Sequence, residues 1–162
     1  MVLRLTSSLN KSRNDTGRTA FCGPTVLSAI TGFPVSTVEQ EIWRVRQQEA
    51  RAETGQAVTG TYGQEVAAAL AAYGYEMALA EDYKSIEKKA RPTVWSWMQK
   101  PRNAWAHYIL GIHKGRQGHW ILVHGVMICD TYTGGSWTFA ATGPHKGAKI
   151  MDVHLVRKSL GV

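Results

Sequence analysis

The stretch TGRTAFCGPTVLSAITG, residues 16–32, decides the first helix of the fold and places a cysteine at its start. Pro24 suits the first turn of a helix, because a helix start leaves its first N–H groups without partners in any case. Apolar residues then recur at helical spacing, and Gly32 favours the end of the helix. The stretch therefore predicts a helix headed by Cys22.

Two interpretations of Cys22 follow from this position. Unpaired N–H groups and the helix dipole favour negative charge at a helix N-terminus, which lowers the pKa of a thiol and prepares a nucleophile. Cysteine is also among the most buried residue types, so a cysteine ahead of an apolar helix is by itself more often a packing residue. A nucleophile additionally needs a base and donors for an oxyanion, which must come from elsewhere in the chain.

Helical patterns continue through the first half of the chain. Ser36 with Glu39, and Thr61 with Gln64, have the spacing of helix-capping pairs and precede apolar residues at helical spacing. We expect one surface helix that starts at Ser36 and ends before residue 55. A further helix is expected to end at Gly74.

Strands are expected in the second half of the chain. The hydrophobic period changes to two from Tyr75, and Thr93 is a candidate cap for a short helix in residues 93–99. Pieces 107–112, 119–125 and 126–132 predict an antiparallel meander, and 149–158 predicts a final strand. This order predicts one α+β domain over residues 1–162, with N-terminal helices packed on a C-terminal antiparallel sheet and residues 1–20 as a polar lead-in loop.

His119 is the histidine whose surroundings best suit a catalytic base. It opens the apolar strand HWILV, directly after the loop KGRQG. Asp130 ends the next expected strand, so in a meander that turns at Gly125 the two side chains lie at the same end of neighbouring strands. Asp130 would then orient the imidazole and stabilise its charged form. Taken singly, His119 is a strand-end residue and Asp130 is a turn residue.

Two segments together resemble a known family. FCGPTVLSAITG (21–32) and GHWILVHGVMICDTYTGG (118–135) are similar to papain-like cysteine peptidases, nearest to the bacteriocin-leader-processing (double-glycine) type and its phage relatives. The resemblance implies a papain-like fold in which the cysteine heads the central helix. It also implies Cys22 as the nucleophile, His119 as general base and acid, and Asp130 as the residue that orients the imidazole.

Two further residues are candidates for the same site. The family has a glutamine that donates its side-chain amide to the oxyanion, and this sequence has Thr16 at that position. Asn14 is the nearest amide side chain and is therefore the oxyanion candidate. Trp120, beside His119, is a candidate wall of a substrate cleft. Cys129 lies within an apolar strand and is expected in the core.

The charge and hydropathy of the chain exclude some classes of binding partner. The net charge of +7 favours polyanions, but the basic residues are scattered, which predicts a solvated surface and no nucleic acid partner. No apolar run reaches the ~18 residues of a membrane span and no export signal is seen, so we expect no membrane association and a location in the cytoplasm or in a phage particle. No cofactor is expected. No metal site is expected either, since His119 and His124 fall on opposite faces of one strand.

The sequence favours a cysteine peptidase or amidase that hydrolyses a peptide or isopeptide bond of a peptide or protein substrate through a thioester. One alternative is a catalytically inactive papain-like module with a structural or interaction role, such as a phage virion component. Another is a peptidoglycan amidase or endopeptidase. Polyanion binding, resting on the charge alone, is the remaining alternative, and the sequence makes no prediction about the oligomeric state.

Overall fold

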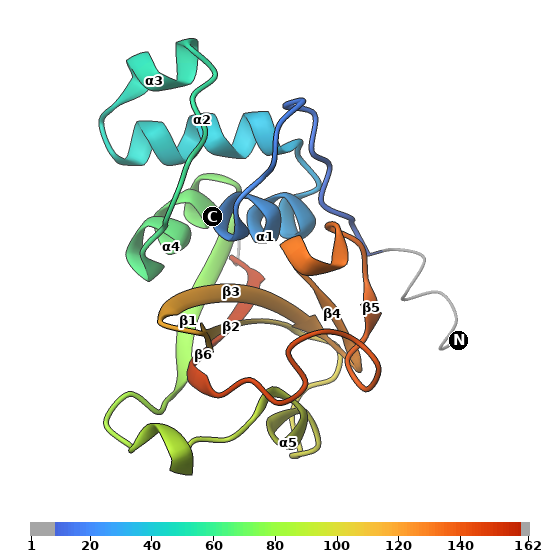
Figure 1. The fold of residues 1–162 in the computed structure, drawn as a ribbon. Helices are drawn as coiled ribbons and strands as arrows, with labels where there is room; N and C mark the ends of the chain where they lie inside the picture. Colours follow the sequence, from blue (N-terminus) through green and yellow to red (C-terminus); the bar gives the residue numbers. More distant parts are fainter. Residues whose placement is uncertain (1–8, 160–162) are drawn as a thin grey trace.

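The structure is a computed structural model that describes residues 9–159 and has a mixed helical and antiparallel β architecture (Figure 1). This confirms the α+β class. The helices are α1 (Cys22–Thr31), α2 (Val35–Val45), α3 (Glu49–Glu53), α4 (Gly63–Ala72) and α5 (Val94–Met98), with short 3-10 turns η2 (Lys88–Ala90) and η3 (Thr131–Thr133). The strands are β1 (Tyr75–Asp82), β2 (His107–Lys114), β3 (Gln117–His124), β4 (Met127–Cys129), β5 (Thr138–Phe139) and β6 (Ile150–Lys158).

The six strands form one sheet in the order β1-β6-β2-β3-β4-β5. The expected meander is present, because β2 pairs with β3 and β3 with β4, both antiparallel. The last strand, β6, lies between β1 and β2 and pairs with each. The C-terminal strand therefore joins the early strand β1 to the meander and makes it part of the same sheet.

The sheet separates two hydrophobic cores. Helices α1, α2 and α4 cover one face, and α5 lies against the other (Figure 1). Side chains alternate between the faces along each strand. On β2, Ile109 therefore packs with α1, α2 and α4, whereas Leu110 packs with α5; both are fully buried.

The local helix signals at Gly32 and Thr93 are confirmed: Gly32 ends α1 with a left-handed φ of 79°, and Thr93 caps α5.

The second helix begins differently from the expectation. α2 starts at Val35, so Ser36 lies inside its first turn and is not the cap. Its N–H and hydroxyl donate instead to the carboxylate of Asp15, which comes from the lead-in segment. The single helix expected here is also divided in two. α2 ends at Val45, Gln47 has a left-handed φ of 57°, and α3 follows as a separate short helix. Contacts from a distant segment thus replace the local capping pair.

The cap expected at Thr61 is also displaced. α4 begins at Gly63, and the Glu65 carboxylate accepts the N–H of Tyr62 at 2.9 Å. The Thr61 hydroxyl, expected as the cap, accepts the indole N–H of Trp120 at 3.1 Å. The residues before α4 are thereby tied to the N-terminal half of β3, across the two halves of the chain.

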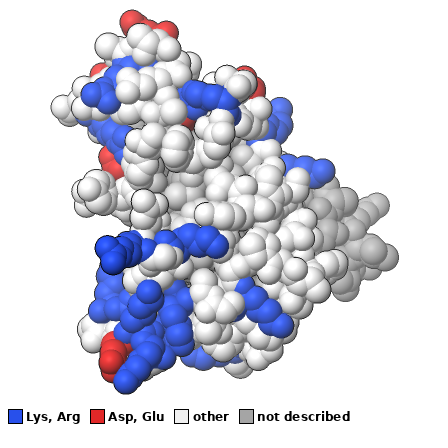
Figure 2. Space-filling view, viewed as in Figure 1, with Lys and Arg blue, Asp and Glu red and all other residues white. Residues whose placement is uncertain are grey.

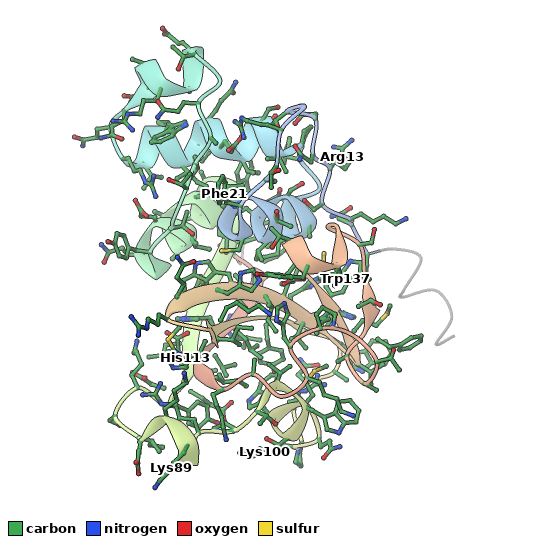
Figure 3. All side chains as sticks on the ribbon, viewed as in Figure 1. Arg13, Phe21, Lys89, Lys100, His113 and Trp137 are labelled. Atoms are coloured by element: carbon green, nitrogen blue, oxygen red, sulfur yellow. The ribbon has the colours of Figure 1, made fainter. Side chains whose placement is uncertain are left out.

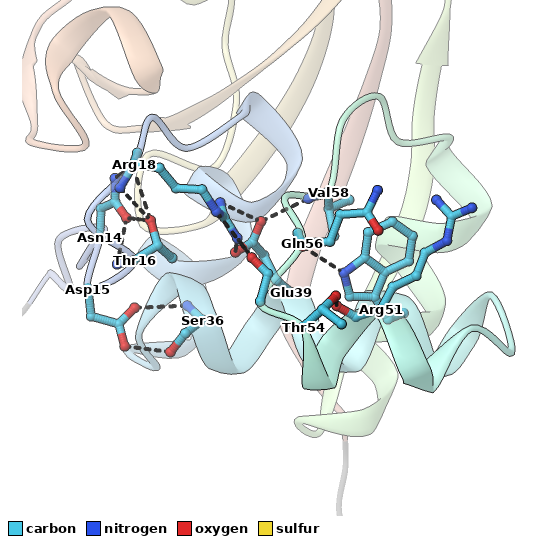
Figure 4. A network of polar contacts seen from close by, with 12 residues as sticks. Asn14, Asp15, Thr16, Arg18, Ser36, Glu39, Arg51, Thr54, Gln56 and Val58 are labelled. Carbon is cyan, nitrogen blue, oxygen red and sulfur yellow. Dashed lines mark hydrogen bonds and ion pairs between the residues drawn. The ribbon is translucent and has the colours of Figure 1, made fainter.

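A buried carboxylate anchors the lead-in segment to α2 (Figure 4). Glu39 is 3% exposed and accepts hydrogen bonds from the Arg18 guanidinium at 2.8 and 3.2 Å and from the N–H of Val58 at 2.9 Å. Arg18 also donates to the carbonyl of Gly55. This network fixes the chain shortly before Cys22.

Among residues 9–159, no helix combines the length and the apolar character that spanning a bilayer requires.

Replacing Arg18 with Ala leaves the Glu39 carboxylate buried without its cation. We expect the free energy of unfolding to fall by about 2–3 kcal/mol, which is below the ~3–5 kcal/mol for a fully buried pair because Arg18 is partly exposed. Urea unfolding measures the change. Arg44→Ala is the matched control, since its ion pair with Glu41 is exposed and should stabilise little. Equal losses in the two variants would contradict this role of Glu39.

Candidate active site

Cys22 heads α1 as its first residue, after Phe21 in extended conformation. Figure 3 labels Phe21 at this end of the helix. Residues 23–30 of α1 are all buried, whereas Cys22 is partly exposed. The next position must be glycine, because a Cβ on Gly23 would lie 2.3 Å from the hydroxyl oxygen of Thr61. The helix thus presents one thiol at the edge of an otherwise buried element.

The surroundings of the thiol favour its ionised form. Burial raises the pKa of Cys22, but the imidazole of His119 and the backbone N–H groups of Trp120 and Gly23 outweigh it, so the pKa lies below the ordinary 9.0. Cys129 shows the opposite case. It is fully buried, as the sequence predicted, and burial raises its pKa to about 12. The two thiols therefore differ strongly in their expected reactivity.

The strands bring His119 and Asp130 together as predicted. His119 lies near the start of β3 and is 8% exposed, and its Nε2 lies 2.6 Å from Oδ2 of the fully buried Asp130. Although burial lowers the pKa of His119, the Asp130 carboxylate and the Cys22 thiol raise it to about 9. The same imidazole interacts with the Cys22 thiol, and this interaction favours the ionised form of each group. The thiol, imidazole and carboxylate form a chain in the expected order.

Asp130 fulfils both roles that the sequence left open. Its Oδ1 accepts the N–H of Thr133 at 3.0 Å and caps η3, which is its turn role. Its Oδ2 simultaneously faces the imidazole. Burial raises the pKa of Asp130, but the hydrogen bonds from His119 and His145 lower it to about 2. The carboxylate therefore stays ionised at neutral pH.

His145 is the site residue that the sequence analysis missed. It lies in the segment between β5 and β6, its side chain is 1% exposed, and its Nε2 lies 2.7 Å from the same Oδ2 of Asp130. No periodicity marks an irregular segment, so the sequence held no signal for this contact. The polar atoms of His119, Asp130 and His145 lie within 4.8 Å of one another, close enough for a metal ion. Both Nε2 atoms are, however, engaged with the carboxylate oxygen, which favours hydrogen bonding over ligation.

Trp120 lies where a cleft wall was expected. A cavity of about 330 Å³ opens beside Cys22 and His119, and Trp120 lines it. The indole is held by Thr61, whose carbonyl and hydroxyl both accept its N–H. The remaining lining residues come from the segment before α4 and from the sheet: Gly60, Tyr62, Gly63, Gly111, Gly118 and Met151. The glycines in this lining leave space beside the thiol.

Asn14 lies in the lead-in segment and is engaged there. Its Nδ2 donates to the carbonyl of Arg18 at 2.6 Å, and its Oδ1 accepts from the N–H and hydroxyl of Thr16. Among the described residues, the lining of the Cys22 cavity includes no side-chain amide. In this arrangement the amide of Asn14 stabilises a loop, and its predicted role as an oxyanion donor stays a prediction.

Comparison of the chain with protein-family models, with curated proteins and with solved structures finds no match. The chemistry of the site therefore follows from its own geometry. A thiol of lowered pKa, an imidazole of raised pKa and a buried carboxylate make a set suited to nucleophilic catalysis with proton transfer.

At pH 7 we expect iodoacetamide to modify Cys22 well before Cys129, because only the Cys22 pKa is lowered. His119→Ala removes the largest of the causes that lower this pKa, so alkylation of Cys22 should slow by about tenfold or more. Peptide mass mapping measures both rates. His124→Ala is the matched control on the same strand, since His124 contacts the carbonyl of Trp105 instead. A Cys22 rate that is indifferent to His119 would contradict the pairing.

Proposed function

We propose that this chain is a papain-like cysteine peptidase or amidase that hydrolyses an amide bond in a peptide or protein through a thioester. The observation that carries the proposal is the chain of contacts from Cys22 at the head of α1 through His119 to the buried Asp130. The layering of α1 against an antiparallel sheet whose strand β3 supplies the imidazole supports the papain-like assignment.

The acylation step uses the thiolate and the imidazolium. The sulfur of Cys22 attacks the carbonyl carbon and forms a C–S bond, the C–N bond breaks, and His119 gives its Nδ1 proton to the leaving amine. Asp130 accepts the Nε2–H of His119 throughout and so fixes the ring orientation. In the second step water attacks the thioester carbon and His119 takes a proton from that water. The C–S bond breaks, the carboxylic acid product leaves, and the Cys22 thiolate is restored beside the His119 imidazolium.

The N-terminus of α1 supplies one donor for the oxyanion. The first N–H groups of a helix have no partner within the helix, and here the helical bonding starts with the N–H of Thr25 donating to Phe21. The N–H of Cys22 is therefore available where negative charge develops on the substrate oxygen. A second donor from a side-chain amide is the role predicted for Asn14.

The surface charge favours acidic substrates. Lys and Arg gather on the lower part of the face drawn in Figure 2, below the helices. Exposed cations follow β1 and cap the β2–β3 turn: Lys84, Lys88, Lys89, Lys114 and Arg116. The Lys114 ammonium lies 4.5 Å from the centre of the Tyr132 ring, which in turn packs against His119. The Lys114 ammonium would therefore attract an acidic group of the substrate toward the His119 side of the site.

A catalytically inactive module with the same fold is the second candidate. The observation that favours it is the engagement of Asn14 with the Arg18 carbonyl, which leaves the oxyanion with backbone donors alone. Losing one oxyanion donor slows catalysis by roughly a hundred- to a thousand-fold. A structural or interaction role, such as that of a phage virion component, would need no turnover.

Digestion of a proteome-derived peptide library separates the two candidates. We expect new peptide ends with the parent protein, read by mass spectrometry, and their complete loss with Cys22→Ala. Asp130→Asn should retain the thiol but lower kcat by roughly 10²–10⁴-fold, because a neutral amide neither selects the His119 tautomer nor stabilises its charged form. Purified peptidoglycan as a parallel substrate separates an amidase from a peptidase. If neither substrate gives Cys22-dependent products while Cys22 alkylates rapidly, the inactive module is the better account.

A further inference from the structure

The Asp130 carboxylate has two imidazole partners, and the proposed mechanism uses one of them. His119 and His145 place their Nε2 atoms 2.6 and 2.7 Å from the same oxygen, Oδ2. Both nitrogens must carry a proton to donate to an ionised carboxylate. The ring centres of the two histidines lie 5.2 Å apart, so a positive charge on His119 lies close to the ring of His145.

The buried surroundings select one tautomer of His145. Its Nδ1 is buried and has no hydrogen-bond partner among the described residues. A doubly protonated ring would bury an unpaired N–H, which is costly, whereas a neutral ring with its proton on Nε2 leaves only an acceptor unpaired. His145 then donates to Asp130 without adding a second positive charge beside the His119 imidazolium.

The backbone and its neighbours hold His145 in place. Its φ of 69° lies in the left-handed region, which residues other than glycine adopt infrequently. The ring of Tyr132 stands perpendicular to both imidazoles, at 4.9 Å from His145 and 5.2 Å from His119. The groups facing His145 are thus Asp130, His119 and Tyr132, with the Lys114 ammonium on the Tyr132 ring. A less common conformation is kept where the surroundings fix it.

We propose that His145 is a positioning residue: as a neutral Nε2–H tautomer it holds Oδ2 of Asp130 in place, so that Asp130 fixes the ring of His119 against Cys22. The effect of His145 on catalysis rests on the proposed function, because the orientation of His119 matters only where Cys22 acts as a nucleophile. The hydrogen bond to Asp130 itself is independent of turnover. His145 holds Oδ2 of Asp130, whereas the N–H of Thr133 holds the other carboxylate oxygen, Oδ1.

The tautomer is tested on the unmodified protein. ¹⁵N NMR of the histidine rings at pH 7 should show His145 neutral with its proton on Nε2, and the loss of its signals in His145→Gln assigns them. A neutral ring with its proton on Nδ1 would overturn the proposal, because Nε2 could then not donate to the carboxylate. A doubly protonated ring would overturn it as well, because the proposed tautomer is neutral. This result decides the role of His145 whether or not any peptide is cleaved, so its failure is distinguishable from failure of the proposed function.

Two variants separate positioning from packing. His145→Gln keeps an N–H donor at similar reach, and His145→Leu fills the space without one. With both variants shown to be folded by urea unfolding, we expect Cys22 alkylation at pH 7 to stay within about twofold of the parent rate in His145→Gln. It should slow by about tenfold in His145→Leu, because a hydrogen bond to a charged group is lost. Equal rates in the two folded variants would overturn the proposal.

Discussion

The buried carboxylate of Asp130 is the interaction on which the site depends. Fully removed from solvent, it needs partners, and it finds them in His119, His145 and the N–H of Thr133. A charge in the interior is tolerated only where such partners offset its lost hydration. The same contacts join β3, the turn after β4 and the segment before β6, so one carboxylate links three separate parts of the chain to the chemistry.

The nucleophile depends equally on close packing at the other side of the cleft. Because Gly23 has no side chain, the first turn of α1 approaches Thr61, and Thr61 in turn holds the indole of Trp120. The backbone of Trp120 then contributes to lowering the pKa of Cys22. The segment before α4, the helix α1 and the strand β3 are thereby arranged around one thiol, with the 330 Å³ cavity beside it.

The sequence predicted those helices and strands that depend on interactions between residues close together in the chain. The helix headed by Cys22 and ended by Gly32, and the period of two in the meander, are read directly from neighbouring residues. The order of strands was not predictable, since alternation shows which face a residue takes but not which strand lies beside it. Ser36 failed as a cap because Asp15, distant in sequence, takes its donors. His145 was missed because its contact arises entirely from tertiary structure.

The ionisation of Cys22 tests the account most directly. Thiolate absorbance at 240 nm, followed from pH 3 to 10 in the parent protein and in Cys22→Ser, isolates the titration of this one thiol, because Cys129 with a pKa of about 12 stays protonated over that range. We predict a thiolate that forms clearly below pH 9 in the parent protein, and a loss of that early ionisation in His119→Ala. A Cys22 thiol that ionises only at or above pH 9 in the parent protein would contradict the thiolate–imidazolium pair and with it the proposed chemistry.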